Sequence, residues 1–183
     1  PEANRNLAAA FEGRAVRKVY LALVMGRPRQ PQGVIDAPIT RDRDGRYRVT
    51  TATDPRGQSA RTRYRVLARP ARDALTLLEV IPETGRSHQI RVHLSSIGHP
   101  IVGDLLYGAG GSLYLSALKG KKKYRLSKDA EEERPLLGRL ALHASSISFK
   151  DFTTGENIHV ESGLPKDMLV AISKLRQYSA LLK

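Results

Sequence analysis

The chain has 183 residues, enough for one domain with a hydrophobic core, and 40% of them are hydrophobic and 27% charged, as in ordinary globular proteins. No apolar run approaches the roughly 20 residues of a membrane helix, and nothing in the sequence predicts export. The absence of cysteine excludes disulfides and a cysteine nucleophile and fits the cytoplasm. The 31 Lys and Arg against 18 Asp and Glu give a net charge of +13, which favours nucleic acid as a partner over a membrane surface.

The first half of the chain is predicted to consist of one helix followed by strands. Residues 2–14 fit a helix, because Leu7, Ala8 and Phe11 fall on one face. Alternating and β-branched residues then predict a strand over residues 16–25, which contains Tyr20. Further strands are expected over residues 34–39, 47–51, 60–67 and 75–81.

The second half begins with a change from strand to helix. Ile90, Leu94 and Ile97 have the spacing of one apolar face of a helix over residues 87–97, and Gly98 is placed to end it. A charged insertion over residues 110–134 follows, rich in lysine at 119–128 and acidic at 129–133, and we expect a solvated segment there, with an RNA-contacting loop as the alternative. Strands over 140–149 and 157–161 and a helix over 165–182 complete the chain. These elements predict an α+β fold with a mixed, largely antiparallel sheet and a few flanking helices.

Residues 84–93 (Thr-Gly-Arg-Ser-His-Gln-Ile-Arg-Val-His) place several polar side chains where a strand gives way to a helix. The free backbone N–H groups at a helix start attract phosphate, and Arg86 stands there. His88 and Arg91, three residues apart, share one face of the helix, while Ile90 and Leu94 bury the other. The segment therefore fits one wall of an active site that acts on RNA. The alternative is an amphipathic helix with ordinary exposed polar residues.

The same segment resembles the signature of RluA-type RNA pseudouridine synthases. It continues with Leu94, then with Gly-His-Pro-Ile-Val-Gly-Asp at 98–104 and Tyr-Gly at 107–108. The likeness covers nearly the whole chain except residues 110–134. Four further stretches occur in the order of that family: Lys-Val-Tyr-Leu-Ala at 18–22, Gly-Gln-Ser-Ala-Arg-Thr-Arg-Tyr at 57–64, Leu-Ala-Leu-His-Ala at 140–144 and Gly-Leu-Pro-Lys-Asp at 163–167.

The resemblance implies that uridine in ribosomal or transfer RNA is isomerised to pseudouridine, by a monomer with no cofactor and no metal ion. A carboxylate acts covalently on a nucleoside whose base is extruded from its stack. By position in the motifs, Tyr20 would pack against the uracil, and Arg91 would pair with the catalytic aspartate and keep it ionised. The residues expected at the RNA or the target nucleotide are Arg86, His88, Gln89 and Ile90.

The sequence differs from the family pattern at the nucleophilic aspartate. It lies in a His-Arg-Leu-Asp…Thr-Ser-Gly motif upstream of the tyrosine strand, and this motif does not occur in the 183 residues. Asp42 lies in a charged turn without the Thr-Ser-Gly, and Asp104 is expected to be structural. We therefore expect residues 1–183 to be the C-terminal larger part of one catalytic domain, inactive by itself.

Two other classes of function remain open at this point. A non-catalytic module that binds RNA or the ribosome would explain both the charge and the missing aspartate. A metal-dependent hydrolase could use His88, His93 and Asp104, although the two histidines point about 140° apart on a helix and cannot easily share a metal ion.

Overall fold

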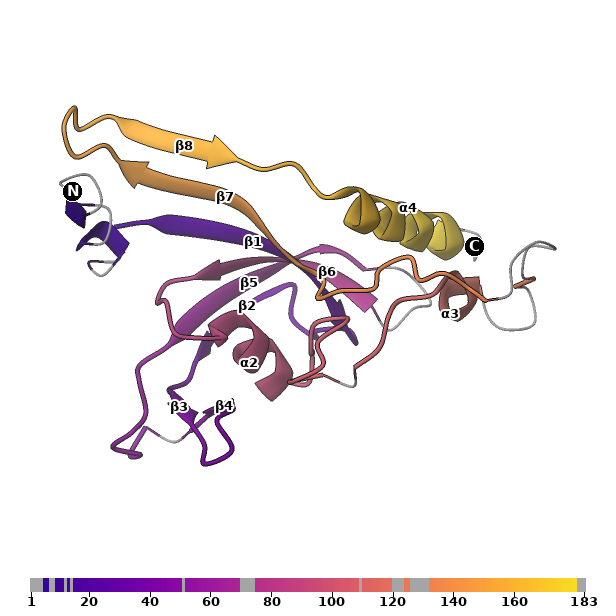
Figure 1. The fold of residues 1–183 in the computed structure, drawn as a ribbon, viewed down its shortest axis with the longest axis horizontal. Coiled ribbons are helices and arrows are strands. Elements are labelled where there is room, and N and C mark those ends of the chain that lie inside the picture. The colour runs from indigo at the N-terminus through magenta and orange to yellow at the C-terminus, as the bar shows by residue number, and fades with distance from the viewer. Residues whose placement is uncertain are drawn as a thin grey trace.

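The structure is a computed structural model, and it describes residues 5–6, 9–11, 13, 15–50, 52–69, 75–108, 110–119, 124–125 and 132–180. The centre of the fold is a twisted six-stranded sheet in the order β2-β5-β6-β1-β7-β8, with a small β3-β4 hairpin beside it (Figure 1). The strands are β1 (Arg17–Met25), β2 (Gln32–Asp36), β3 (Ile39–Arg41), β4 (Tyr47–Val49), β5 (Arg61–Ala68), β6 (Leu75–Pro82), β7 (Leu142–Lys150) and β8 (Asn157–Glu161).

The middle of the sheet is its most buried part. β6, with the sequence Leu-Thr-Leu-Leu-Glu-Val-Ile-Pro, is covered on both faces and lies between β5 and β1. Because it has apolar or β-branched residues at nearly every position, it suits a strand without a solvent-facing side. The edge strand β8 is mostly exposed. Every described pairing of the sheet is antiparallel, so the parallel component of a mixed sheet is not found among these strands.

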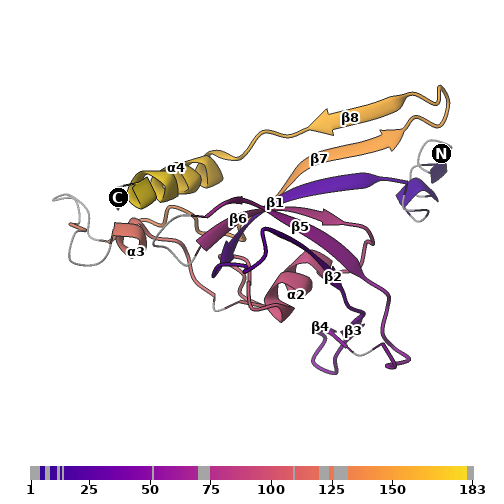
Figure 2. The ribbon, with the colours of Figure 1, turned by 180° about the vertical axis from the view of Figure 1, so that it is seen from behind.

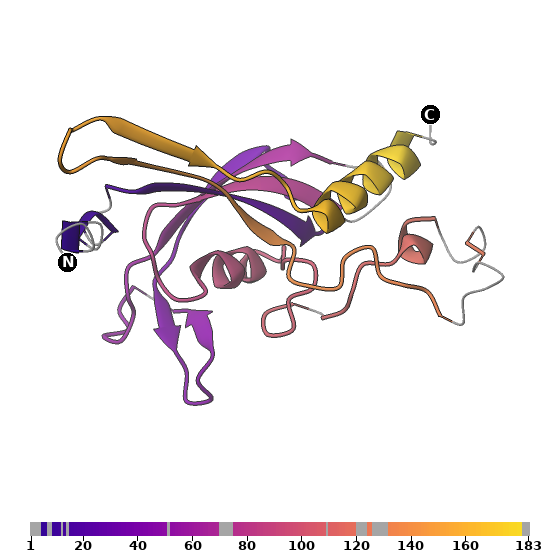
Figure 3. The same cartoon turned by 45° about the horizontal axis from the view of Figure 1, so that its top comes forward.

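The helices that follow the central strands in the described part of the chain are α2 (Gln89–Ser96), α3 (Leu115–Lys119) and α4 (Lys166–Ala180). In Figures 1 and 3, α2 and the β3-β4 hairpin lie on one side of the sheet and α4 lies on the other. The view from behind shows the β7-β8 hairpin extending away from α2, toward the N-terminus (Figure 2). None of the helices in the described part of the chain is long and apolar enough to cross a membrane.

The predicted α+β class and the strands are confirmed, with differences at some boundaries. The strand expected over 34–39 is divided into β2 and β3, because Pro38 has no N–H to donate to a ladder. Helix α2 begins two residues later than predicted. Gly98 ends it with φ 80°, as expected, but Ile97 is 37% exposed and does not share the apolar face with Ile90 and Leu94.

Two predicted elements fall partly on residues outside the described ranges. Of the first helix, residues 5–6 and 9–11 are described and helical, whereas Leu7 and Ala8 lie outside. Of the charged insertion, residues 120–123 and 126–131 lie outside, and residues 115–119 form the short helix α3, which the sequence pattern did not predict.

Candidate active site

A buried hydrogen-bond network fixes the turn between β6 and α2. The Gln89 side chain, 3% exposed, accepts bonds at Oε1 from Thr84 Oγ1 (2.7 Å) and the Arg86 N–H (2.9 Å). Its Nε2 donates to the Arg61 carbonyl (2.9 Å) and to Thr62 Oγ1 (3.0 Å) on β5. Because all four bonds go to protein groups, Gln89 ties the start of the helix to the sheet.

The network continues to His93, which is fully buried. Its Nε2 lies 2.9 Å from the Ala37 carbonyl, and its Nδ1 lies 2.8 Å from Thr62 Oγ1. A carbonyl only accepts, so Nε2 carries the proton, and the Thr62 hydroxyl, which accepts from Gln89, donates to Nδ1. Burial lowers the pKa of His93, although the bond to Ala37 opposes this, and so favours the neutral imidazole.

The other face of α2 carries an ion pair between Arg91 and Asp104. Arg91 Nε donates to Asp104 Oδ2 (2.9 Å) and Nη2 donates to Oδ1 (2.8 Å), in the bidentate arrangement typical of strong guanidinium–carboxylate pairs. The Asp104 side chain is fully buried, whereas 17% of the Arg91 side chain is exposed. Burial alone would raise the pKa of Asp104, but the bonds from Arg91 and from the N–H groups of Tyr107 and Leu106 hold it below its usual value.

Tyr107 lies between this ion pair and His88. The Arg91 guanidinium carbon is 4.9 Å from the centre of the Tyr107 ring, within cation–π range. The Tyr107 hydroxyl lies 2.8 Å from His88 Nδ1 and 3.2 Å from the Tyr47 N–H on β4. Burial, and then the positive charge of Arg91, lower the pKa of His88. His88 has φ 54°, the one non-glycine residue with positive φ among those described, and such strain is concentrated at functional sites.

Tyr20 lies on the face of the sheet that α2 covers. Thr62 on β5 is hydrogen-bonded to α2 residues, so its side chain points toward that helix. Tyr64, two residues further along β5, points to the same face of the sheet. Tyr64 is paired with Val80, and Val80 with Tyr20, and directly paired residues point to the same face. Tyr20 is half-buried and packs against the core cluster that includes Ile90. The described hydrogen bonds do not join Tyr20 to Arg91.

Comparison with known proteins identifies the family. The family model described as RNA pseudouridylate synthase matches residues 1–96. The chain belongs to this family. An uncharacterized RNA pseudouridine synthase of Chloroflexus aurantiacus is 51% identical over 176 residues, covering 96% of this chain and 47% of the relative. Ribosomal large subunit pseudouridine synthase D of Nitrosomonas europaea is 40% identical over 177 residues, covering 96% of this chain and 45% of the relative.

A solved structure has the same fold. Human RNA pseudouridylate synthase domain containing 4 superposes with a TM-score of 0.70 at 27% identity, covering 96% of this chain and 68% of that one. The chain spans about half the length of the curated relatives it matches.

The predicted RNA-contacting residues differ in their exposure in the structure. Arg86 and His88 lie at the start of α2, and Arg86 Nε reaches the Ser59 carbonyl (3.0 Å). Gln89 and Ile90 are 3% and 7% exposed, so their burial disfavours the direct RNA contact expected for them. Gln89 instead positions the turn that precedes the helix.

Sequence reasoning missed two connections in the site. Asp104 was expected to be structural, but its pairing with Arg91 was not foreseen, and Tyr107 had no assigned role. Both residues belong to the Gly-Asp-x-x-Tyr-Gly stretch at 103–108, whose polar residues next to small ones were the available signal. His88, His93 and Asp104 each have other partners, and the described residues contain no metal-binding cluster of histidines and carboxylates.

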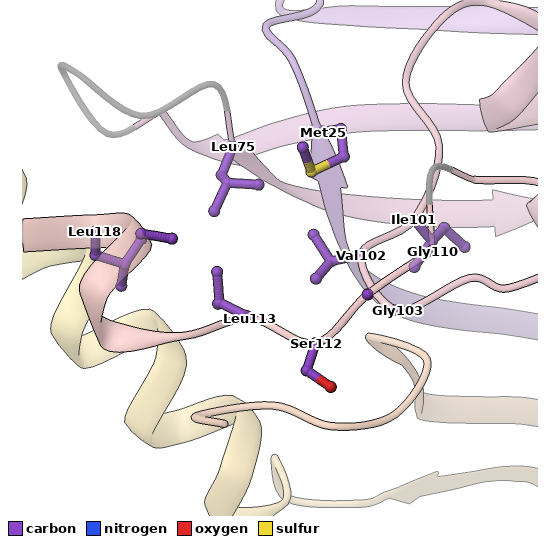
Figure 4. Close-up of a pocket in the computed structure, with 11 residues that line it drawn as sticks. Met25, Leu75, Ile101, Val102, Gly103, Gly110, Ser112, Leu113 and Leu118 are labelled. Atoms are coloured by element: carbon purple, nitrogen blue, oxygen red, sulfur yellow. The ribbon is translucent and has the colours of Figure 1, made fainter. Parts of the chain in front are cut away.

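An apolar pocket of about 240 Å³ is lined by none of the side chains described above. Met25, Leu75 and Val102 surround it together with Leu113 and Leu118 of the α3 region (Figure 4). Among the residues that the structure describes, those lining this pocket have no ionisable side chain. The polar site at Arg91 is therefore the better candidate for acid–base and nucleophilic chemistry.

Proposed function

We propose that this chain forms the arginine and tyrosine wall of an RNA pseudouridine synthase that converts a uridine of ribosomal or transfer RNA to pseudouridine. The observation that carries the proposal is the bidentate Arg91–Asp104 pair, next to Tyr107 and His88 and on the side of the sheet that presents Tyr20. The proposed enzyme is cytoplasmic and monomeric and needs neither a cofactor nor a metal ion, as the family resemblance implies.

The reaction is an isomerisation, so the atoms of the product are those of the substrate. The bond between ribose C1′ and uracil N1 breaks, a bond between C1′ and C5 forms, C5 loses a proton and N1 gains one. An aspartate acts covalently on the nucleoside and leaves at the end. Its motif is not in these 183 residues, so a segment outside them must supply it.

Arg91 is suited to hold such a carboxylate. Asp104 occupies Nε and Nη2 of the guanidinium, so neither bond uses Nη1. We propose that Nη1 binds the nucleophilic aspartate. An adjacent guanidinium lowers the pKa of a carboxyl group, which would keep this aspartate ionised and aimed at C1′. Asp104 would then act through Arg91, by fixing its orientation from the buried side.

The remaining site residues divide into those that contact the substrate and those that position it. Tyr20 would lie against the extruded uracil and assist the loss of the C5 proton, and Arg86 and His88 would contact the RNA. Gln89 would hold Arg86 in place through its backbone N–H. This division follows exposure, since a side chain with all its polar atoms bonded inside the protein offers none to RNA.

Release of tritium from RNA labelled at uridine C5 tests the proposal directly, because every turnover frees that hydrogen. We expect no release with the 183-residue chain, and release when it is extended by an upstream segment that carries His-Arg-Leu-Asp. Changing the aspartate of that segment to asparagine is the matched control and should abolish release. Turnover by the 183-residue chain alone would contradict the missing nucleophile.

The second candidate, a non-catalytic module that binds RNA or the ribosome, is favoured by the net charge of +13 and by the missing aspartate motif. The same experiment separates the two functions. RNA binding without tritium release from the extended protein, on both ribosomal and transfer RNA, would support the binding module and reject the enzyme.

A further inference from the structure

We infer that Tyr107 is a positioning residue of this site: its ring holds the Arg91 guanidinium, and its hydroxyl joins His88 to the β3-β4 hairpin. The inference rests on the proposed function and adds a residue through which RNA binding and the orientation of Arg91 are linked.

The hydroxyl of Tyr107 connects two elements that are far apart in the sequence. The backbone N–H of Tyr47 can only donate, so the hydroxyl accepts that bond (3.2 Å). The single hydroxyl proton is then free to be donated to His88 Nδ1, 2.8 Å away. In this arrangement His88 is neutral and carries its proton on Nε2, which leaves Nε2–H as a donor outside the bond to Tyr107.

The ring and backbone of Tyr107 hold Arg91 from two directions. The ring lies 4.9 Å from the guanidinium carbon. The Tyr107 N–H donates to Asp104 Oδ1 (3.0 Å), the same oxygen that accepts from Arg91 Nη2. The Tyr107 carbonyl accepts from Ser95 Oγ (2.6 Å), one helical turn beyond Arg91 on α2. A shift of Tyr107 would therefore move the ion pair and the helix together.

The hairpin that Tyr107 contacts is basic and packs on α2. Tyr47, Val49 and Tyr107 pack against a small core cluster of Ile39, Ala60 and Val92. The strands and tip of the hairpin present exposed arginines, which would contact RNA phosphates. They are Arg41, Arg43, Arg46 and Arg48. RNA bound to the hairpin would therefore affect the position of Tyr107, the residue that holds Arg91.

The two parts of the side chain make separable predictions in the extended, aspartate-bearing protein. Tyr107→Phe keeps the ring below Arg91 and removes the hydroxyl, so the KM for RNA should rise roughly two- to tenfold with kcat nearly unchanged. Tyr107→Leu also removes the ring, and kcat should fall by about a hundredfold, the cost of misplacing a catalytic group by about 1 Å. The matched control is Tyr114→Phe, which should change neither constant. Tyr114 lies outside the site and is 37% exposed.

A second measurement uses the 183-residue chain and needs no turnover. Nitrogen-15 NMR of the His88 ring should show the Nε2–H tautomer in the wild type and a mixture of both tautomers in Tyr107→Phe. Thermal unfolding of each variant shows whether it folds. Unchanged His88 resonances in Tyr107→Phe, or equal loss of kcat in the Phe and Leu variants, would overturn the inference.

The outcomes separate this inference from the proposed function. If the extended wild-type protein releases no tritium, the proposed function fails, and the His88 resonances still test the hydroxyl bond. If the wild type is active and both Tyr107 variants keep its kcat and KM, the role of Tyr107 fails and the proposed function stands.

Discussion

The two faces of helix α2 use polar residues in opposite ways. On the buried face, the side chains of Gln89 and His93 have their hydrogen bonds satisfied by β5, Thr84 and Ala37, and they hold the helix in place. On the other face, Arg91 is bound on two nitrogens and keeps part of its side chain exposed. Polar residues in one short helix therefore differ in the number of bonds they already make within the protein, and on this basis we assign Gln89 and His93 to the fold and propose Arg91 for the reaction.

Replacing Arg91 should have the largest effect. In the extended protein, Arg91→Met should lower kcat by about a hundredfold or more, because the nucleophile loses its electrostatic partner. The affinity for RNA should fall much less, since the proposed partner is a carboxylate and not a phosphate. Single-turnover rates and filter binding on the same RNA give the two numbers, and equal losses would reject this role of Arg91.

The same variant also leaves the buried Asp104 without its cation. We expect a loss of about 3 kcal/mol in the free energy of unfolding. This value is near the lower end of the range for removing one partner of a buried ion pair, because Arg91 is partly exposed. Urea unfolding of the 183-residue chain measures it. Arg91→Met/Asp104→Leu removes both charges and should recover part of the stability while leaving kcat low, which separates the catalytic loss from the folding loss.

Substituting a polar residue on the buried face of α2 should destabilise the chain without changing a group proposed to react. Gln89→Leu removes the acceptor of the Arg86 N–H and of the Thr84 hydroxyl, at a cost of about 2 kcal/mol, whereas the Arg61 carbonyl keeps its bond from the Glu83 N–H. Gln177→Leu, at an exposed position of α4, is the matched control and should change stability by less than about 0.5 kcal/mol. Similar unfolding midpoints for the two variants would contradict the role of Gln89.

Lowering the pH should reduce the stability of the folded chain through His93, on the buried face of α2. Its pKa is lowered in the folded chain, so the unfolded chain binds a proton first as the pH falls below the ordinary value of 6.5. The stability associated with neutral His93 is therefore complete above about pH 6.5 and is lost as the pH falls toward the lowered pKa. His88 contributes with the same sign. His93→Gln, which keeps a donor and an acceptor, should reduce the loss of unfolding free energy between pH 7.5 and pH 5.5; an unchanged loss would exclude His93 as its source.

The smallest effect is expected at Arg86. Arg86→Gln should weaken RNA binding by the 183-residue chain about threefold and lower the slope of log affinity against log salt by about one, the signature of one lost phosphate contact. Arg176→Gln removes the same charge from an exposed position of α4, on the other side of the sheet. It should leave the slope unchanged, and equal changes in both variants would assign the effect to net charge alone.

Local patterns were sufficient for the strands and for helices α2 and α4, apart from some boundaries. Alternation predicted the strands, and the apolar spacing with Gly98 predicted the end of α2, because these signals depend on neighbours a few residues apart. They did not predict that Ile97 is exposed, which follows from the end of the helix before it. They also did not predict that Gln89 is buried, because its partners Arg61 and Thr62 lie on the distant strand β5. No local pattern distinguishes a polar residue that is saturated inside the protein from one that is open to RNA.

The sequence by itself therefore determined the fold class, the basic character and the family motifs around Arg91, since composition and short-range spacing encode them. The tertiary structure decided which of those motif residues face one another. It joined Arg91 to Asp104, and Tyr107 to His88 and to Tyr47, across separations of 13, 19 and 60 residues in the chain. Contacts over such distances depend on how the sheet, the helix and the hairpin pack, which no single segment specifies.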